Sequence, residues 1–546
     1  MSSSLDDVEQ KCNELMEMAV SVTWLEVYLR DDLSITVDLA TKGRPSRQAT
    51  FPIETPGTTP EVHRRVFSTL ARIVEGNGVS NVNNVSIQVS NRVDGHNQTG
   101  THEMTPFLQS IAGSSTIQWL NVGADSSIDG DSSDSSVDTE QSDNTSQPTN
   151  MAPMVAALAA NLTSPHSVLN KLYLHDIHFD DELLTVLCEA ISSRESRLVS
   201  LEFDDCRFPT LGPLWSALAT NESISNLDFG CLGLEEETVG DIYGSQQVQE
   251  MLETNMTMTK LNLDIYDSPF PNSFLTALGN GLGSNTTLKA MDLTEINPSQ
   301  HGYINALFEG GLDRNTGLER LSLKLKDLSA MQELVSGLDR MAKQSSTKGR
   351  SDGSGRVSTL KRLFLTFHLH LDDAECVMLA LDCLIRNRAY FALEELHFVC
   401  SGGNSDKDNV ECWNKLAAAI QACPSLTTFH MNLQNVLNDS RMETVANSLE
   451  NNTKMTRFQT GGLRANANLR RRNDWNPSAN PNHTRILCSI VRNIRELPLF
   501  VESSKRSLLP LVLRRLLKPT EFETEKVVNL NHAFHLIQNL PDLFSS

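Results

Sequence analysis

The chain of 546 residues has no uninterrupted apolar stretch near the ~20 residues that a membrane-spanning helix needs. It is also poor in basic residues, with 46 Lys and Arg against 68 Asp and Glu and a formal net charge of -22. General binding of nucleic acid or of anionic membranes requires clustered cations, so we expect neither. A protein partner with a basic surface fits this charge better.

The ten cysteines include no Cys-x-x-Cys pair. Cys188, Cys376 and Cys423 fall at core-like positions of predicted helices or turns, so we interpret them as reduced, buried thiols. Residues 1–7 have neither the basic region nor the apolar core of a secretory signal. The expected compartment is therefore the cytoplasm or the nucleus.

Catalytic motifs are absent from the sequence as well, since it contains no nucleophile elbow, His-Glu-x-x-His or Walker motif. Two His/Asp clusters, at 175–181 and 368–373, could bind a metal. Both follow a predicted strand, where a polar loop leading to an acidic helix start is expected on structural grounds alone. We predict no enzymatic activity, no cofactor and no metal.

A twelve-residue phrase occurs six times in the middle of the chain. It consists of an apolar residue, then Asn or Cys three positions on, then apolar residues three, six and eight positions beyond, with Thr460 as the one polar exception. The occurrences begin at Leu218, Leu252, Leu282, Leu312, Ile420 and Leu449. A chain that repeats one supersecondary unit must stack those units to bury their apolar edges.

The second half of the phrase, apolar-x-x-apolar-x-apolar, occurs more widely, mostly at steps of 26 to 35 residues. Its first apolar residues are Val82, Ile117, Leu169, Leu198, Ile224, Met258, Leu288, Leu318, Leu360, Leu393, Leu426 and Met455. The alternation at its end predicts a short strand, and the remainder of each unit has helical periodicity. We therefore predict an α/β solenoid of about 12 degenerate repeats, with a parallel concave sheet and convex helices.

These motifs resemble the ribonuclease-inhibitor-like branch of the leucine-rich repeat (LRR) superfamily, over roughly residues 80 to 460. The resemblance implies a horseshoe that binds other proteins. The short polar side chain of Asn or Cys is expected at the turn into each strand, where it can hydrogen-bond backbone groups that a curved stack leaves unpaired.

The flanks and two inserts depart from the repeat. Residues 1–78 read as an N-terminal α/β cap, with strands at 22–29 and 35–39 and a helix at 60–75. Residues 461–546 are predicted to form a basic helical C-terminal cap, although the basic amphipathic segment within it could instead bind a membrane surface or a partner. The solenoid at 79–460 contains an acidic Ser/Asp insert and a basic Gly/Ser insert, at 124–149 and 342–358.

The acidic insert contains no Lys or Arg and too little apolar surface to order itself, so we predict a disordered region. Ser126 and Ser135 each have an Asp three residues later, which makes them candidates for regulatory phosphorylation. A tolerated insertion at a loop tip is the alternative.

The residues between the buried strand positions should point onto the concave face. Adjacent strands there present five carboxylates, followed by a reversal of sign further along the chain. The candidate partner-binding residues are Glu202, Asp204, Asp228, Asp264 and Asp292, and then Arg320, Lys324 and Arg362. Like charges on strands ~4.8 Å apart repel, and a basic partner would relieve that repulsion.

The leading functional hypothesis is a monomeric, non-catalytic protein-interaction scaffold. The alternative is a regulator of an enzyme, such as a GTPase-activating or inhibitor protein with the same type of repeat. GTPase-activating proteins of that type typically carry an acidic tail after the repeats, whereas this tail is basic. A sensor part of an immune-type receptor is a third reading, and it would need another subunit for nucleotide binding.

Overall fold

The structure is a computed structural model. The residues that it describes are 5–19, 22–29, 34–40, 46–51, 59–75, 82–90, 104–125, 151–234, 241–263, 270–293, 302–325, 327–348, 359–367, 373–388, 390–391, 393–400, 410–432, 439–452, 454–455 and 457–460. The chain forms two compact units, each described by itself below. Unit 1 comprises residues 1–300 and 310–315, and unit 2 comprises residues 301–309 and 316–546.

Unit 1 is built on a mostly parallel sheet with the strand order β12-β11-β9-β7-β6-β5-β4-β1-β2-β3. Only the pairs β1–β2 and β2–β3 within this described sheet are antiparallel. The strands are β1 (Trp24–Leu29), β2 (Ile35–Ala40), β3 (Arg47–Phe51), β4 (Asn84–Ser90), β5 (Trp119–Asp125), β6 (Lys171–His175), β7 (Ser200–Asp204), β9 (Asn226–Gly230), β11 (Lys260–Leu263) and β12 (Ala290–Leu293). A second ladder pairs β8 (Arg207–Phe208) with β10 (Gly233–Leu234).

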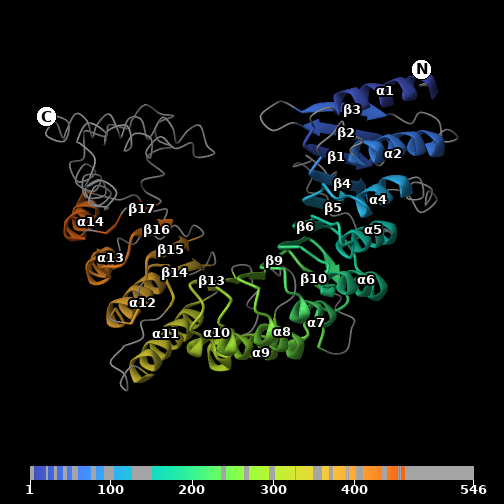
Figure 1. The fold of residues 1–546 in the computed structure, drawn as a ribbon. Helices are drawn as coiled ribbons and strands as arrows, with labels where there is room; N and C mark the ends of the chain where they lie inside the picture. The colour runs from blue at the N-terminus through green and yellow to red at the C-terminus, as the bar shows by residue number, and fades with distance from the viewer. Residues whose placement is uncertain are drawn as a thin grey trace, which may run out of the picture. The chain divides into compact units, whose positions relative to one another are not determined.

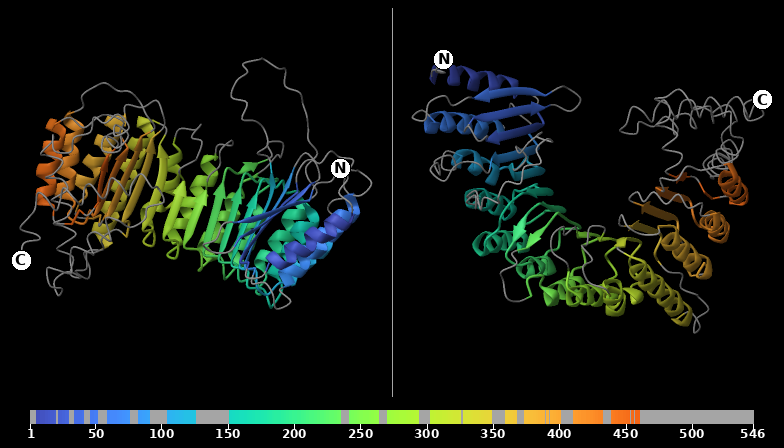
Figure 2. Two further views of the ribbon diagram at one scale, coloured as in Figure 1. Left: turned by 90° about the horizontal axis from the view of Figure 1, so that it is seen from above. Right: turned by 180° about the vertical axis from the view of Figure 1, so that it is seen from behind.

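The helices of unit 1 lie along one face of this sheet (Figures 1 and 2). They are α1 (Leu5–Met18), α2 (Thr59–Glu75), α4 (Thr105–Ala112), α5 (Ala152–Leu162), α6 (Asp181–Ser192), α7 (Gly212–Thr220), α8 (Ser245–Thr254) and α9 (Asn272–Ser284), followed by the 3-10 turn η1 (Leu312–Arg314). No described helix covers the other face of the sheet, which we call the open face of unit 1.

Unit 2 repeats the arrangement with a parallel sheet in the order β17-β16-β15-β14-β13. Its strands are β13 (Arg320–Leu325), β14 (Arg362–Phe367), β15 (Glu395–Cys400), β16 (Thr428–Asn432) and β17 (Arg457–Thr460). Its helices are α10 (Tyr303–Gly310), α11 (Leu328–Lys348), α12 (Asp373–Arg386), α13 (Val410–Ala422) and α14 (Asp439–Asn451). These helices also lie on one side of their strands (Figure 1), and the opposite side is the open face of unit 2.

The strand–helix repeat and its register are confirmed. Each of the twelve residues that begin the predicted motif lies two positions before the first residue of a strand, from Val82 before β4 to Met455 before β17. All twelve are buried, with at most 3% of their surface exposed. Each strand therefore begins at the same point of the repeat, because an apolar side chain at the equivalent position is buried in the core there.

The asparagine of the phrase has the expected structural role. Asn255 is buried, and its Nδ2 donates to Leu218 O at 2.7 Å, one repeat earlier. Its Oδ1 accepts from Thr257 N at 2.9 Å and from Met258 N at 2.8 Å. One side chain thus forms hydrogen bonds with backbone groups of two successive repeats, at a turn that lies outside the strand ladder.

The N-terminal residues extend the same sheet, because β1 pairs in parallel with β4. The strands predicted at 22–29 and 35–39 are present as β1 and β2, and the helix predicted at 60–75 is α2. Helix α1, which packs on α2 and β3, was not predicted from the sequence.

The two inserts begin later than the sequence indicated. β5 runs to Asp125, so the first two residues of the acidic insert belong to the sheet, and 126–149 lie outside the described residues. α11 runs to Lys348, because Met341 and Ala342 continue its buried face. Residues 461–546, where the basic C-terminal cap is predicted, also lie outside the described part of the chain.

Cys188, Cys376 and Cys423 are buried and form no disulfide, as predicted. Burial raises the pKa of Cys188 to about 12 and that of Cys423 to about 11, which keeps both thiols protonated. Within the described ranges, no helix combines the length and the apolar character that crossing a bilayer would require.

Candidate interaction surface

A column of side chains crosses the open face of unit 1, one from the middle of each strand. The register pairs Glu26 with Ser86, then Asn121, Tyr173, Glu202, Asp228, Asn262 and Asp292 in turn. The sequence motif predicted this order for every member from Ser86 onward. We call this set the middle column.

Asp204 lies beside the middle column, at the end of β7, and it is engaged by two residues of β6. Tyr173 Oη donates to Asp204 Oδ2 at 2.5 Å, and His175 Nδ1 lies 3.3 Å from the same oxygen without forming a hydrogen bond. Burial and the hydrogen bond to Asp204 raise the pKa of Tyr173. Gly230 stands opposite Asp204, and a Cβ there would lie only 2.8 Å from Asp204 Oδ1. The missing side chain leaves room for the carboxylate.

Glu202 is the carboxylate most available to a ligand. It is exposed, and among the described residues it has no hydrogen-bond or ion-pair partner. Its pKa is raised, first because the surrounding protein partly removes the carboxylate from water and then by the negative charges of Asp228 and Asp204. The positive charges of Lys260 and Lys171 lower it. The like-charge repulsion expected from the sequence is therefore present at this position.

Asp228, in contrast, is already neutralised in part. Lys260 Nζ lies 3.0 Å from its Oδ2, and Asn262 Nδ2 donates to its Oδ1 at 2.5 Å. Lys260 was not predicted from the sequence, because only the central exposed position of each strand was compared across repeats. Lys260 lies two residues before that position, on the same face of β11. The face from β6 to β12 thus combines four carboxylates with two lysines, Lys171 and Lys260.

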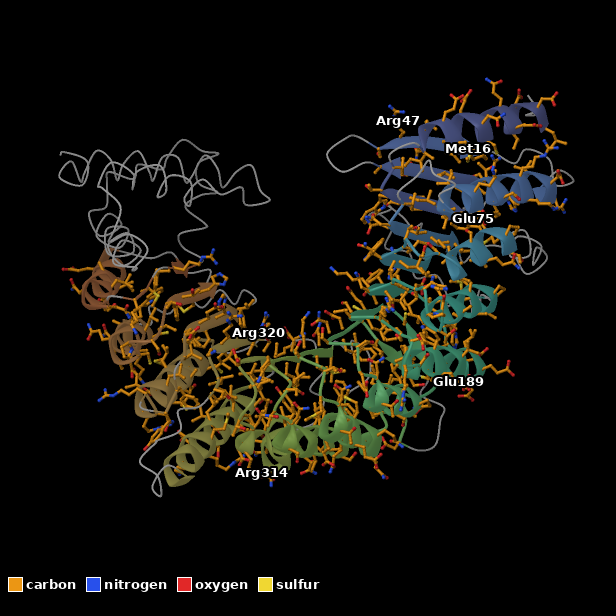
Figure 3. The ribbon with its side chains drawn as sticks, viewed as in Figure 1. Met16, Arg47, Glu75, Glu189, Arg314 and Arg320 are labelled. Atoms are coloured by element: carbon orange, nitrogen blue, oxygen red, sulfur yellow. The ribbon has the colours of Figure 1, made fainter. Side chains whose placement is uncertain are left out.

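The other predicted residues divide into three groups. Asp292 is in the middle column, in register with Asn262, whereas Asp264 lies outside the described residues. Arg320, Lys324 and Arg362 lie on the open face of unit 2, and Figure 3 shows Arg320 on the side of β13 away from α11. Both phosphorylation candidates, Ser126 and Ser135, fall outside the part of the chain that the structure describes.

An aromatic pair on the same open face was not foreseen. The rings of Trp24 and Trp119 have centroids 4.8 Å apart, and the two residues flank Asn84 in the register of β1, β4 and β5. Beside them, the Glu26 carboxylate accepts from Trp24 Nε1 and from Tyr28 Oη, each at 2.8 Å. A signal was present, since Trp24 and Trp119 each open a strand, but the strand positions outside the centre were not compared across repeats.

Within the described residues there is no cluster of three or more His, Cys, Asp or Glu side chains that could hold a metal ion. Asp180 instead caps α6, because its Oδ1 accepts from Leu183 N at 2.8 Å, which is the structural role expected after a strand. The open face of unit 1 therefore presents carboxylates that lysines neutralise in part, and partly buried tryptophans farther along the same sheet.

No protein-family model matches this chain, and no curated protein matches it. A structural comparison finds a crystal structure of a structural-genomics protein from Bacteroides fragilis, which is 10% identical and covers 66% of this chain and 89% of that chain. The TM-score is 0.25, so this likeness carries no argument about fold or function. What the structure itself shows is an α/β repeat architecture in which strands of a mostly parallel sheet alternate with helices.

Proposed function

We propose that the chain is a leucine-rich repeat protein of the ribonuclease-inhibitor-like type and acts as a non-catalytic scaffold. Its partner would be a protein with a basic surface, bound on the open face of unit 1, which corresponds to the concave face of a horseshoe in that superfamily. The observation that carries this proposal is Glu202, an exposed carboxylate without a partner among the described residues. Its pKa is raised first by partial removal from water and then by its neighbours Asp228 and Asp204.

A bound cation would act directly on that unfavourable ionisation. A Lys or Arg of the partner placed near Glu202 would offset the repulsion from Asp228 and Asp204, so part of the binding free energy would come from strain already present in the free protein. Tyr173 on the neighbouring strand, and Trp119 and Trp24 farther along the same face, supply large, partly exposed aromatic surfaces, the residue types that dominate binding energy at protein interfaces.

The test compares charge reversal on and off the open face. Proteins bound from native lysate are identified for the wild type, for Glu202→Lys and for Glu189→Lys. Glu189 is an exposed residue of α6 on the helix side (Figure 3), so its reversal changes the net charge equally. The proposal expects partners with basic surfaces to be lost from Glu202→Lys alone. If both variants keep the full set of partners, the open face of unit 1 is not the binding surface.

A further inference from the structure

Three rings from consecutive strands lie side by side on the open face of unit 2. Phe364, His397 and His430 are in register on β14, β15 and β16. The rings of Phe364 and His397 stack with centroids 4.2 Å apart, and His430 meets His397 edge-on at 5.4 Å. We call these three residues the ring row.

A line of five side chains, three of them arginines, lies next to the ring row, two residues earlier on the same face. The register places Arg320, Arg362, Glu395, Thr428 and Arg457 in order across β13 to β17. The Arg320 guanidinium lies 4.3 Å from the centroid of the Phe364 ring, and Arg362 Nε lies 3.3 Å from Glu395 Oε1. We call these five residues the arginine line.

The charge of this face is opposite to that of the chain as a whole. The alternate strand positions on the open face of unit 2 hold four cations, the three arginines and Lys324, against one carboxylate, Glu395. Glu319, the residue before β13, forms an ion pair with Lys361, whose Nζ lies 3.0 Å from Glu319 Oε2. A protein with a net charge of -22 therefore concentrates positive charge on one sheet face.

We propose that the open face of unit 2 binds an acidic peptide segment of a partner protein, with side-chain carboxylates on Arg320 and Arg362 and with the ring row beneath the peptide. Arginine forks match the geometry of carboxylates, and Arg320 is already oriented by its contact with Phe364. Glu395 stands between Arg362 and Arg457 in the arginine line. Spaced carboxylates can avoid this fixed negative charge, whereas a continuous phosphate backbone cannot.

The histidines make the binding sensitive to pH. The pKa of His397 is lowered to about 4 by burial, and further by His430, Arg320 and Arg457. Its Nε2 lies 3.9 Å from Glu395 Oε2, and no other described carboxylate lies within ion-pair distance of it. A peptide carboxylate on Arg320 offsets one of these positive charges, so the pKa of His397 rises on binding and a proton is taken up. Affinity therefore increases as pH falls through the pKa that His397 has in the complex, which lies above its value of about 4 in the free protein.

The first experiment measures affinity by fluorescence anisotropy, with the full chain and a labelled, acetylated octapeptide of alternating Asp and Ser as the probe. The variants are Arg320→Gln and Arg362→Gln, with Arg388→Gln as the control because Arg388 is an exposed cation in the turn after α12. We expect about a tenfold loss of affinity for each of the first two and none for Arg388→Gln. Matching thermal unfolding curves confirm that each variant is folded.

Three results would overturn the proposal. One is equal affinity for the matched peptide of alternating Asn and Ser, and another is no binding of the acidic peptide by the wild type. The third is tighter binding of a single-stranded RNA oligonucleotide than of the acidic peptide, which would assign the face to nucleic acid. None of these bears on the acidic surface of unit 1, so this proposal and the proposed function can fail separately.

The second experiment repeats the titration between pH 7.5 and 5.5 for the wild type and for His397→Gln. The wild type should bind the acidic peptide more tightly at pH 5.5 than at pH 7.5, and the variant should lose most of that gain. An equal gain in the variant would remove His397 from the proposal.

Discussion

Buried asparagines hold successive repeats together through single side chains. Asn221, Asn255, Asn285 and Asn452 each donate to a carbonyl of the preceding repeat and accept from two backbone amides of their own turn. Buried polar groups are costly unless they are hydrogen-bonded. The amide is needed at this position because it both donates and accepts, which no apolar side chain can do.

Asn255→Ala should therefore lower the free energy of unfolding by roughly 2 to 4 kcal/mol, because it strands buried backbone amides and carbonyls. The neighbouring Met256 is 71% exposed, so Met256→Ala in the same turn should change stability by less than about 0.5 kcal/mol. Urea denaturation followed by circular dichroism measures both. Equal losses of stability for the two variants would mean that the hydrogen bonds of Asn255 do not stabilise the fold.

Charge at Glu202 should affect stability in a pH-dependent way. The pKa of Glu202 is raised in the folded state, so its ionisation weakens folding as pH rises above the ordinary value of 4.5. Glu202→Gln should therefore raise the free energy of unfolding at pH 7.5, and with it the melting temperature. Solvent screening keeps this gain below about 1 kcal/mol, and below pH 4.5 the substitution should have little effect. Melting curves at both pH values decide this, and a variant that melts lower at pH 7.5 would contradict the repulsion.

At the scale of the elements, each helix of unit 1 must fit closely against its neighbour in the stack. Gly244 precedes α8 with φ of 65°, and a Cβ there would lie 2.7 Å from Gly212 Cα at the start of α7. Trp215 of α7 is fully buried, and its Nε1 donates to Tyr243 O at 2.9 Å. The junction between α7 and α8 is thus fixed by a close backbone approach and by one buried indole.

Gly244→Ala should destabilise unit 1 by about 1 to 3 kcal/mol, because the left-handed backbone and the contact with Gly212 both disfavour a side chain. Gly113 is the matched control at the end of α4. Its φ is -88°, and an added Cβ would meet nothing closer than 3.5 Å. Thermal denaturation should show a lower midpoint for Gly244→Ala than for Gly113→Ala, and the reverse order would refute the argument.

At the scale of the whole molecule, the chain carries two open faces of opposite charge character, one in each unit. Glu202 and Asp228 characterise the face of unit 1, and Arg320 and Arg362 that of unit 2. Both faces arise from the same strand register, which places one side chain per repeat in line. The charge of each face therefore depends on which residues occupy equivalent positions of different repeats.

Because the two sets of side chains belong to different units, a substitution in one set should leave binding to the other face unchanged. Glu202→Lys should keep the affinity of the wild type for the acidic octapeptide, and Arg320→Gln should keep the partners with basic surfaces. Anisotropy and purification of partners from lysate, applied to both single variants and to the double variant, measure this. A loss of both activities in either single variant would show that the faces do not act independently.

Much of the fold could be predicted from the sequence, because the repeat is written into local spacing. Val82 and Met455 stand 373 positions apart and still mark the same point of a repeat, two residues before a strand. The middle column followed from counting alone, since side chains alternate between the two faces of a strand. The lengths of the inserts were less accessible, because α11 continues through residues whose composition resembles a loop.

What only the tertiary structure decided is which side chains meet across repeats. Lys260 neutralises Asp228 from the next strand, Trp24 reaches Trp119 across β4, and Arg320 covers the Phe364 ring. These contacts join residues 32 to 95 positions apart, and they depend on rotamers and on the register between strands rather than on spacing within a repeat. The sequence by itself determined where each of the twelve repeat strands begins and which face of the sheet their residues occupy, and the packing of repeats determined the charge and shape of those faces.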